Sequence, residues 1–282
     1  KAAKDLLAKC DTIKENKHWM STENRMLAVN SGTSGELAKD VFFAYRGYRM
    51  NYYAVTAMLA RVYCWAGEYG NAYKEAKEVV DATYSTGSTS TASCFNFSNS
   101  LTTNRKDYNS IIMTFFKSTC YEDYLPYMTK GNDVVLVVNT TNLFGDEAGA
   151  DDRNLDLFGD WDGGDIKYSF KYDIKEGTSG TDMIPAIRLS EMYYIMGEYF
   201  AYKDEFSKAG EMLDKVRYAR GISTTNLASS IGSLEVFHTH LIKEMRREFV
   251  GEGQMFFQYK RLDQKPKDNV VFVFDKPNNE DI

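Results

Sequence analysis

Hydrophobic positions recur at helical spacing from Asn51 to Ala66, and again from Asn71 to Ala82. The segment Gly67 to Gly70 interrupts the pattern, and its glycines favour a turn. Several of the periodic positions hold alanine, which lets two helices approach each other closely. The sequence therefore predicts a helical hairpin over residues 51–82.

A second hairpin is expected over residues 186–220. The positions that carry the pattern are Leu59, Ala60, Tyr63, Ala72, Ala76 and Val79 in the first hairpin, and Tyr193, Met196, Gly197, Phe200, Ala209, Leu213 and Val216 in the second. They follow the tetratricopeptide pattern. Ala60 and Gly197 are 137 residues apart, as are Ala72 and Ala209, so one offset relates both helices. This favours an internal repeat, with two generic amphipathic hairpins as the alternative because the pattern is permissive.

The insertion between the hairpins, residues 85–183, has a different character. Residues 85–103 are rich in Ser, Thr and Asn and predict a loop, as does the Gly- and Asp-rich segment 145–165. Short β-prone runs occur at 111–116, 134–138 and 166–172. Further helices are expected at 1–17, 233–249 and 255–262. The predicted fold is mostly α, with tetratricopeptide-like hairpins, long loops and a few short strands.

Charge and motif content exclude several classes of function. The chain has 34 Lys and Arg against 40 Asp and Glu, so it lacks the cationic surplus of a nucleic-acid-binding protein. Its longest aliphatic run is far shorter than the ~20 residues of a membrane span. The sequence holds no Gly-x-Ser-x-Gly, Gly-x-Gly-x-x-Gly, phosphate-loop or His-Glu-x-x-His motif, and its cysteines have no metal-ligand spacing. We therefore predict no catalytic, metal or cofactor residues.

Aromatic residues in the insertion are the candidate ligand-binding groups. Aromatics make up 14% of the chain, and Trp161 lies in a polar loop between Asp160 and Asp162. An indole beside carboxylates suits a sugar, which offers an apolar face and hydroxyl groups. Tyr121, Tyr124 and Tyr127 cluster around Pro126 in a segment without an evident helical period, and form a second candidate group. The alternative is that these rings only pack the protein, and that Trp161 holds its own loop in place.

The segment 160–165 also resembles the start of a calcium-binding loop. Position twelve, counted from Asp160, is Lys171, where such a loop requires a bidentate Glu. An ordinary Asp/Gly turn is therefore the favoured interpretation, and a calcium ion near 160–165 is left open.

Charged residues at 188–191 and 244–253 form a separate group. Glu244 lies three residues before Arg247 and four before Glu248, so the three share one helical face and can pair with Arg188 or Arg217. Gly251 and Gly253 are expected to end the helix and turn the chain. The residues of this group are Arg188, Glu191, Glu244, Arg246, Arg247, Glu248, Gly251 and Gly253. We expect them to be structural.

Segments 184–194, 213–221 and 242–253 together resemble the C-terminal half of the SusD/RagB family. Residues 59–80 are similar to that family's tetratricopeptide-like hairpin, and 277–282 to a degraded form of its Pro-rich C-terminal signature. The resemblance covers about three quarters of the chain. Gln258 stands where the family usually has Asp, and 275–277 reads Asp-Lys-Pro in place of Pro-Ile-Pro. Both departures fall at scaffold positions.

The resemblance implies a function in binding. SusD-like proteins are lipid-anchored on the outer-membrane surface of Gram-negative cells, where they hold glycans, or sometimes peptides, above a SusC-like transporter. It implies a SusD-like α/α superhelix forming one domain over 1–282, with the signal peptide, lipidated Cys and opening helices of longer members preceding Lys1. Membrane attachment would then come only from that anchor. The family's ligand residues vary, so none is assigned by motif.

Two other functions stay open at this point. A helical-repeat scaffold would bind a peptide or protein on the concave face of its hairpins. A glycosidase would need two carboxylates flanking a sugar bond, and the 40 acidic residues neither exclude nor locate such a pair.

Overall fold

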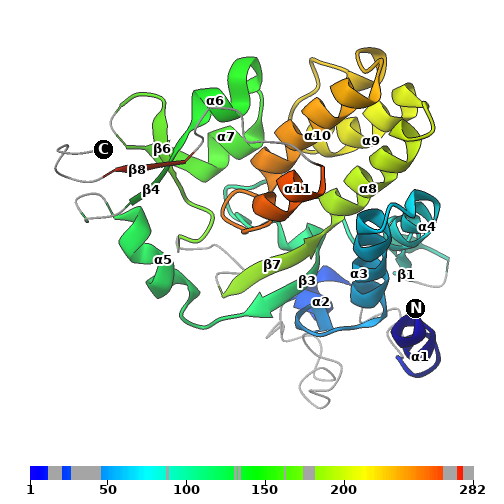
Figure 1. Cartoon of the computed structure of the whole chain (residues 1–282). Helices are drawn as coiled ribbons and strands as arrows, with labels where there is room; N and C mark the ends of the chain where they lie inside the picture. The colour runs from blue at the N-terminus through cyan, green and yellow to red at the C-terminus, as the bar shows by residue number, and fades with distance from the viewer. Residues whose placement is uncertain are drawn as a thin grey trace.

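The fold is described from a computed structural model, which covers residues 1–11, 21–26, 46–86, 89–129, 132, 135–161, 163–173, 182–262 and 272–275. Asp162, residues 12–17 of the first expected helix and the C-terminal segment 276–282 lie outside the described residues. Helices dominate the described part, and the short strands gather at one end and beneath the helices (Figure 1). The mostly α prediction is confirmed.

Both predicted hairpins are present. The first consists of α3 (Tyr52–Trp65) and α4 (Tyr69–Val80), and the second of α8 (Leu189–Ala201) and α9 (Phe206–Tyr218). The Asn51 side chain caps α3 by accepting from the Ala54 N–H, and Gly67 has a φ of 74° in the connecting turn. Ala60 and Ala72 are fully buried, and α4 packs against α8. The two hairpins therefore stack as neighbouring repeat-like units (Figure 1).

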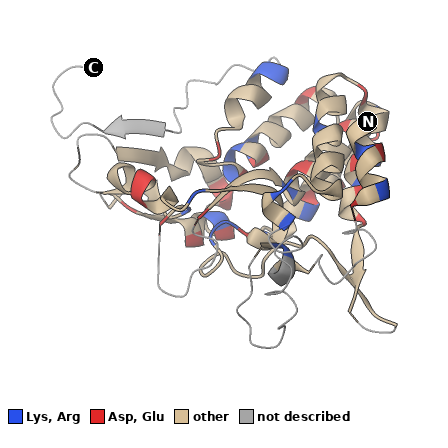
Figure 2. Ribbon diagram, turned by 90° about the horizontal axis from the view of Figure 1, so that it is seen from below, with Lys and Arg blue, Asp and Glu red and all other residues tan. Residues whose placement is uncertain are grey.

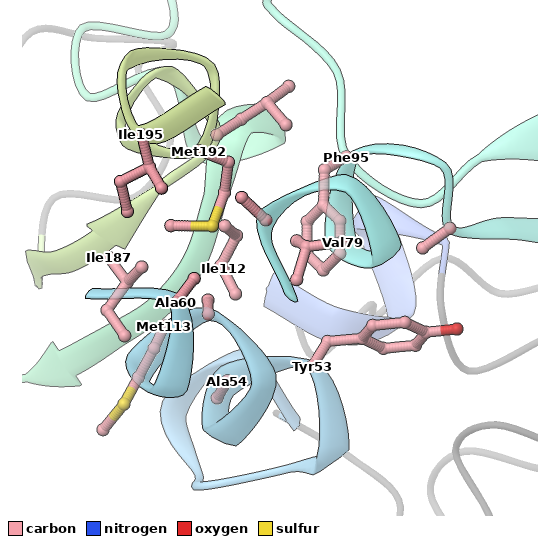
Figure 3. Close-up of a cluster of buried hydrophobic side chains, with 14 of the residues drawn as sticks. Tyr53, Ala54, Ala60, Val79, Phe95, Ile112, Met113, Ile187, Met192 and Ile195 are labelled. Carbon is pink, nitrogen blue, oxygen red and sulfur yellow. The ribbon is translucent and has the colours of Figure 1, made fainter. Parts of the chain in front are cut away.

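Two buried clusters fill the helical part. One joins α3, α4 and α8 to the strands beneath them, and Figure 3 shows Ala60 and Val79 facing Ile112 and Met192 in this cluster. The other lies between α8, α9 and α10 (Leu234–Glu248), with α11 (Met255–Arg261) beside it. Ser233 caps α10 by accepting from the Val236 N–H. The expected helices at 233–249 and 255–262 are confirmed.

The strands of the described residues form three small antiparallel sheets. β1 (Thr83–Ser85) pairs with β2 (Thr91–Ser93), and β3 (Ile111–Phe116) pairs with β7 (Met183–Arg188). The third sheet has the order β5-β6-β4-β8, made by β5 (Phe158–Asp160), β6 (Ile166–Ser169), β4 (Val135–Asn139) and β8 (Phe272–Asp275). The runs at 111–116, 134–138 and 166–172 were thus correctly predicted to contain strands.

The remaining elements are short. The helices are α1 (Ala2–Cys10), α2 (Thr22–Met26), α5 (Cys120–Met128), α6 (Thr140–Phe144) and α7 (Asp152–Leu157), and 3₁₀ turns lie at Arg46–Tyr48, Tyr108–Ser110, Gly145–Glu147 and Leu227–Ser229.

Four local predictions were wrong. The segment 145–165 contains α7 and β5, and 85–103 contains β2, where loops were expected. Residues 186–188 belong to β7, so the second hairpin begins at Leu189. The segment around Pro126 is the helix α5, with Glu122 and Asp123 in its first turn, where acidic side chains favour a helix. Tyr121, Tyr124 and Tyr127 are therefore spaced by three along a helix.

Candidate functional site

Trp161 lies at the tip of the hairpin formed by β5 and β6. Its backbone N–H donates to the Ile166 carbonyl over 3.2 Å, which closes the hairpin. Its half-buried ring meets the Tyr168 ring edge to face, with centroids 6.5 Å apart. Asp160 precedes it with a side chain that is 73% exposed, and Lys167 Nζ lies 3.8 Å from its Oδ1. The tip thus carries an indole that contacts Tyr168 and an exposed carboxylate that lies near Lys167.

The ring row continues along β6 and past its end. Tyr168 and Phe170 lie edge to face at 5.0 Å, and both are half-buried. Gly159 makes room for them, because a Cβ there would lie 2.4 Å from Phe170 Cζ and 3.0 Å from Tyr168 Cζ. We call Trp161, Tyr168 and Phe170 the aromatic row. Tyr168 and Phe170 were not singled out in the sequence, although their alternation within the expected strand 166–172 would have indicated them.

The tyrosines of α5 lie in a different setting. Tyr124 stacks on Tyr172 with centroids 4.1 Å apart and planes 7° apart, and both hydroxyls donate to the Gly251 carbonyl. Burial raises the pKa of both phenols, so they stay protonated donors. Tyr121 is half-buried and Tyr127 exposed. The structure thus gives Trp161 and Tyr124 different aromatic partners, Tyr168 and Tyr172.

Metal ligands and membrane spans were also sought in the described residues. They contain no group of three or more His, Cys, Asp or Glu side chains able to hold a metal ion. Asp162, a carboxylate of the possible calcium loop, lies outside them. No helix in the described part of the chain is long and apolar enough to cross a membrane.

The charged motif residues form a buried ionic frame centred on α10. Glu244 accepts from Arg153 over 3.0 Å and from Arg247 over 2.9 Å. Glu248 accepts from Arg153 over 3.2 Å and from Arg220 over 2.6 Å. All five side chains are buried. The predicted pairing of Glu244 with Arg247 is confirmed, whereas Arg153 and Arg220 are partners that the local pattern did not indicate.

Further charged side chains of both signs surround this centre and belong to the ionic frame. Its other members are Asp107, Glu147, Asp151, Lys171, Arg188, Asp214, Arg217 and Glu252. The two arginines expected near Glu244 and Glu248 are there: Arg217 Nε is 3.7 Å from Glu244, and Arg188 Nη2 is 3.9 Å from Glu248. Figure 2 shows that positions with Lys or Arg (blue) and positions with Asp or Glu (red) are interspersed along the helices.

Electrostatics keep the central carboxylate ionised. Burial alone would raise the pKa of Glu248, but the charges of Arg220 and Arg188 outweigh it and hold the pKa well below its ordinary range. A carboxylate in this state cannot serve as a general acid near neutral pH. We therefore interpret the ionic frame as a structural network of buried ion pairs that holds α10 against its neighbouring elements.

The other motif residues have structural contacts as well. Glu191 accepts two hydrogen bonds of 2.6 Å from Arg61, which ties α8 to α3. Gly251 and Gly253 have φ values of 72° and 71° and turn the chain after α10, as expected. Arg246 is half-buried on α10.

The chain has a helical scaffold of the SusD type. This scaffold is defined by the stacked tetratricopeptide-like hairpins, by helix α10 with Glu244 and Glu248, and by the loop-rich insertion. The model of the SusD family matches residues 45–278, and the chain belongs to that family. No curated protein matches the chain.

Solved structures share the fold at low sequence identity. A SusD superfamily protein from Bacteroides thetaiotaomicron is 23% identical with a TM-score of 0.56, over 77% of this chain and 51% of that one. A SusD-like carbohydrate-binding protein from Bacteroides vulgatus is 19% identical with a TM-score of 0.54, over 82% and 52%. A laminarin-binding SusD-like protein is 17% identical with a TM-score of 0.51, over 79% and 59%. The chain thus spans about half the length of the structures it matches.

Proposed function

We propose that this protein binds a glycan at the cell surface without cleaving it. The observation that carries the proposal is the hairpin tip, where the half-buried ring of Trp161 continues the aromatic row and the preceding residue, Asp160, has an exposed carboxylate. Membership of the SusD family supports it, as do the relatives named for binding carbohydrate and laminarin.

The aromatic row suits a sugar chain in physical terms. The apolar face of a pyranose stacks on an aromatic ring, and a carboxylate accepts hydrogen bonds from its hydroxyls. Tyr168 supports the Trp161 ring from the side, so less rotamer freedom is lost on binding. Asp162 is part of the proposed site by its place in the sequence. Tyr121 and Tyr127 on α5 are proposed as peripheral contacts, with Tyr124 as the residue that anchors their helix.

Membership of the SusD family supports binding without hydrolysis, and Glu248 at the centre of the ionic frame is unsuited to acid catalysis. A glycosidase needs one carboxylic acid whose pKa is raised so that it can protonate the leaving group. The pKa of Glu248 is displaced in the opposite direction. We therefore expect no release of reducing sugar from a bound polysaccharide.

Family membership also supports a location and a partner. We propose that the protein is held at the outer-membrane surface by a lipid anchor outside this chain, and that it passes its ligand to a SusC-like transporter. Co-purification of the tagged protein with an outer-membrane barrel from its native cells would test this part.

Affinity electrophoresis followed by calorimetry tests the proposed site. A panel of soluble polysaccharides that includes laminarin selects the ligand, and wild type is then titrated against Trp161→Ala. Loss of one stacked ring costs about 1–2 kcal/mol, so affinity should fall by about tenfold. The matched control is Trp65→Ala, because Trp65 is also a partly exposed indole but lies on α3, at the opposite side of the molecule from β6 (Figure 1). Equal affinities of Trp161→Ala and wild type would remove Trp161 from the site.

A peptide-binding scaffold is the second candidate. Val62 and Trp65 form an exposed apolar strip on α3, at 53% and 43% exposure, which a peptide could cover. This function predicts no retention on any polysaccharide and weaker peptide binding by Trp65→Ala than by Trp161→Ala. The same two variants therefore separate the candidates.

A further inference from the structure

A small cavity lies inside the ionic frame, near the place where the chain leaves β6. Its volume is about 10 Å³, which suffices for one water-sized guest. Most of its wall is cationic, and the residues responsible are Arg105, Arg153, Lys171, Arg188, Arg220 and Arg247. Glu248 is the carboxylate on this wall. We call this space the arginine cavity.

Three residues of the wall carry a buried N–H group that finds no acceptor among the described residues. The atoms are Nε of Arg105, Nε of Arg188 and Nη1 of Arg220. The other nitrogens of these guanidinium groups are well paired: Arg220 donates to Glu248 and Asp107, and Arg188 to Glu252. Buried donors in native proteins almost always have an acceptor. The arginine cavity therefore provides what one acceptor-rich guest requires.

The guest must accept several hydrogen bonds and need not donate any. A halide ion accepts from every direction, whereas a water molecule brings two hydrogens that need acceptors of their own. Glu248 already accepts from Arg153 and Arg220. The carboxylates that balance the ionic frame, such as Asp107 and Glu252, are not on the cavity wall. The wall cations are paired with carboxylates that lie outside the wall, so the unpaired N–H groups, and not a surplus of positive charge, are what favour an anion inside the cavity.

We propose that the arginine cavity binds one small monovalent anion of the chloride class. The anion joins the unpaired donors of Arg105, Arg188 and Arg220 and thereby completes the ionic frame. Arg105 also donates to the Phe170 carbonyl, and Lys171 donates to the Val250 carbonyl. An occupied cavity therefore stabilises the segment from which the aromatic row extends, although no contact between anion and glycan is required.

Anomalous scattering gives a direct test. Crystals of the full chain are soaked in sodium bromide, and data are collected at the bromine absorption edge. We expect an anomalous peak within hydrogen-bonding distance of Arg188 and Arg220. A cavity that contains only ordinary, non-anomalous solvent density at saturating bromide would overturn the proposal in favour of an internal water molecule.

Thermal unfolding supplies a second, independent test in solution. The Tm is measured in bromide and in gluconate, an anion too large for the cavity, at equal ionic strength so that screening is matched. An anion bound only by the folded state at about thirty times its dissociation constant should raise the Tm by about 3 °C. Equal Tm values in the two salts at every concentration would contradict the proposal.

A pair of conservative variants assigns the effect to the cavity. Arg105→Lys keeps the charge but removes the Nε donor, so the bromide concentration for half the effect should rise about tenfold. Arg61→Lys is the control, since Arg61 pairs with Glu191 and does not line this cavity. A bromide response of Arg105→Lys equal to that of Arg61→Lys would place the anion elsewhere.

Discussion

Replacing Glu248 by Gln removes one negative charge from the centre of the ionic frame and leaves the shape of the side chain nearly unchanged. Glu248 accepts from Arg153 over 3.2 Å and from Arg220 over 3.1 and 2.6 Å. A Gln can offer one oxygen to these arginines, but its amide group must then face a guanidinium donor. The variant therefore loses both charge pairing and hydrogen bonds in a buried position.

The size of the effect follows from the partners that remain. Breaking a buried ion pair from one side typically costs about 3–5 kcal/mol, because the other charge stays buried without compensation. Here Arg153 keeps Asp151 and Arg220 keeps Asp107, each at 2.7 Å. We therefore expect the lower end, about 3 kcal/mol, which corresponds to a fall in Tm of about 5 °C for a chain of this length.

Denaturation in urea, followed by far-ultraviolet circular dichroism, measures this loss. The midpoint should fall while the slope of the transition stays constant, since the surface exposed on unfolding is unchanged. Glu205→Gln is the control, because its pair with Lys208 is exposed to solvent and should contribute little to stability. The reasoning is refuted if Glu248→Gln lies within about 1 kcal/mol of wild type, or if the control loses as much.

Two further predictions concern the helices and the pH dependence of stability. Ala60→Leu and Gly197→Leu should each cost about 1–3 kcal/mol by overpacking, whereas Gly70→Ala should gain about 0.5–1 kcal/mol, and urea denaturation checks all three. The reason is local: a Cβ at Gly197 would lie 3.2 Å from the Phe237 ring, but one at Gly70 meets nothing within 4 Å. For Glu147, burial raises the pKa but Arg217 and Arg247 outweigh it and lower the pKa from 4.5 to about 2. Its contribution is present above pH 4.5 and lost as the pH falls toward 2, so the stability difference between wild type and Glu147→Gln should shrink over that interval in denaturation at graded pH.

The helical part of the fold could be predicted because its signals are local. The small residues of the hairpins recur at helical spacing, and Ala60 and Gly197 occur at the same position of the two copies. The pairing of Glu244 with Arg247 also follows from their spacing on one helix. Such features need only a window of a few turns.

Features that depend on distant partners could not be predicted in this way. β7 pairs with β3 across a long stretch of chain, and its residues Ala186 and Ile187 are apolar, which also suits the start of a helix. Arg153 and Arg220 reach Glu248 from other elements, so only the folded chain brings them together. In the candidate site, Trp161 was found because of its polar neighbours, but Gly159, which makes room for Phe170, had no signal of its own.

The aromatic row and the ionic frame meet at two adjacent residues. Mutations in the row and in the frame should therefore affect glycan binding and stability differently. Phe170 ends the row, while Lys171 donates to the carbonyls of Glu248 and Val250 and belongs to the frame. The rings of Tyr168 and Trp161 are half-buried, so Trp161→Ala should change stability by at most about 1 kcal/mol while it weakens glycan binding. Glu248→Gln acts in the opposite way, because it lowers stability while the folded molecules keep an intact row. A binding defect in folded Glu248→Gln as large as that of Trp161→Ala would mean that the frame sets the position of the row, and that the two cannot be treated as separate units.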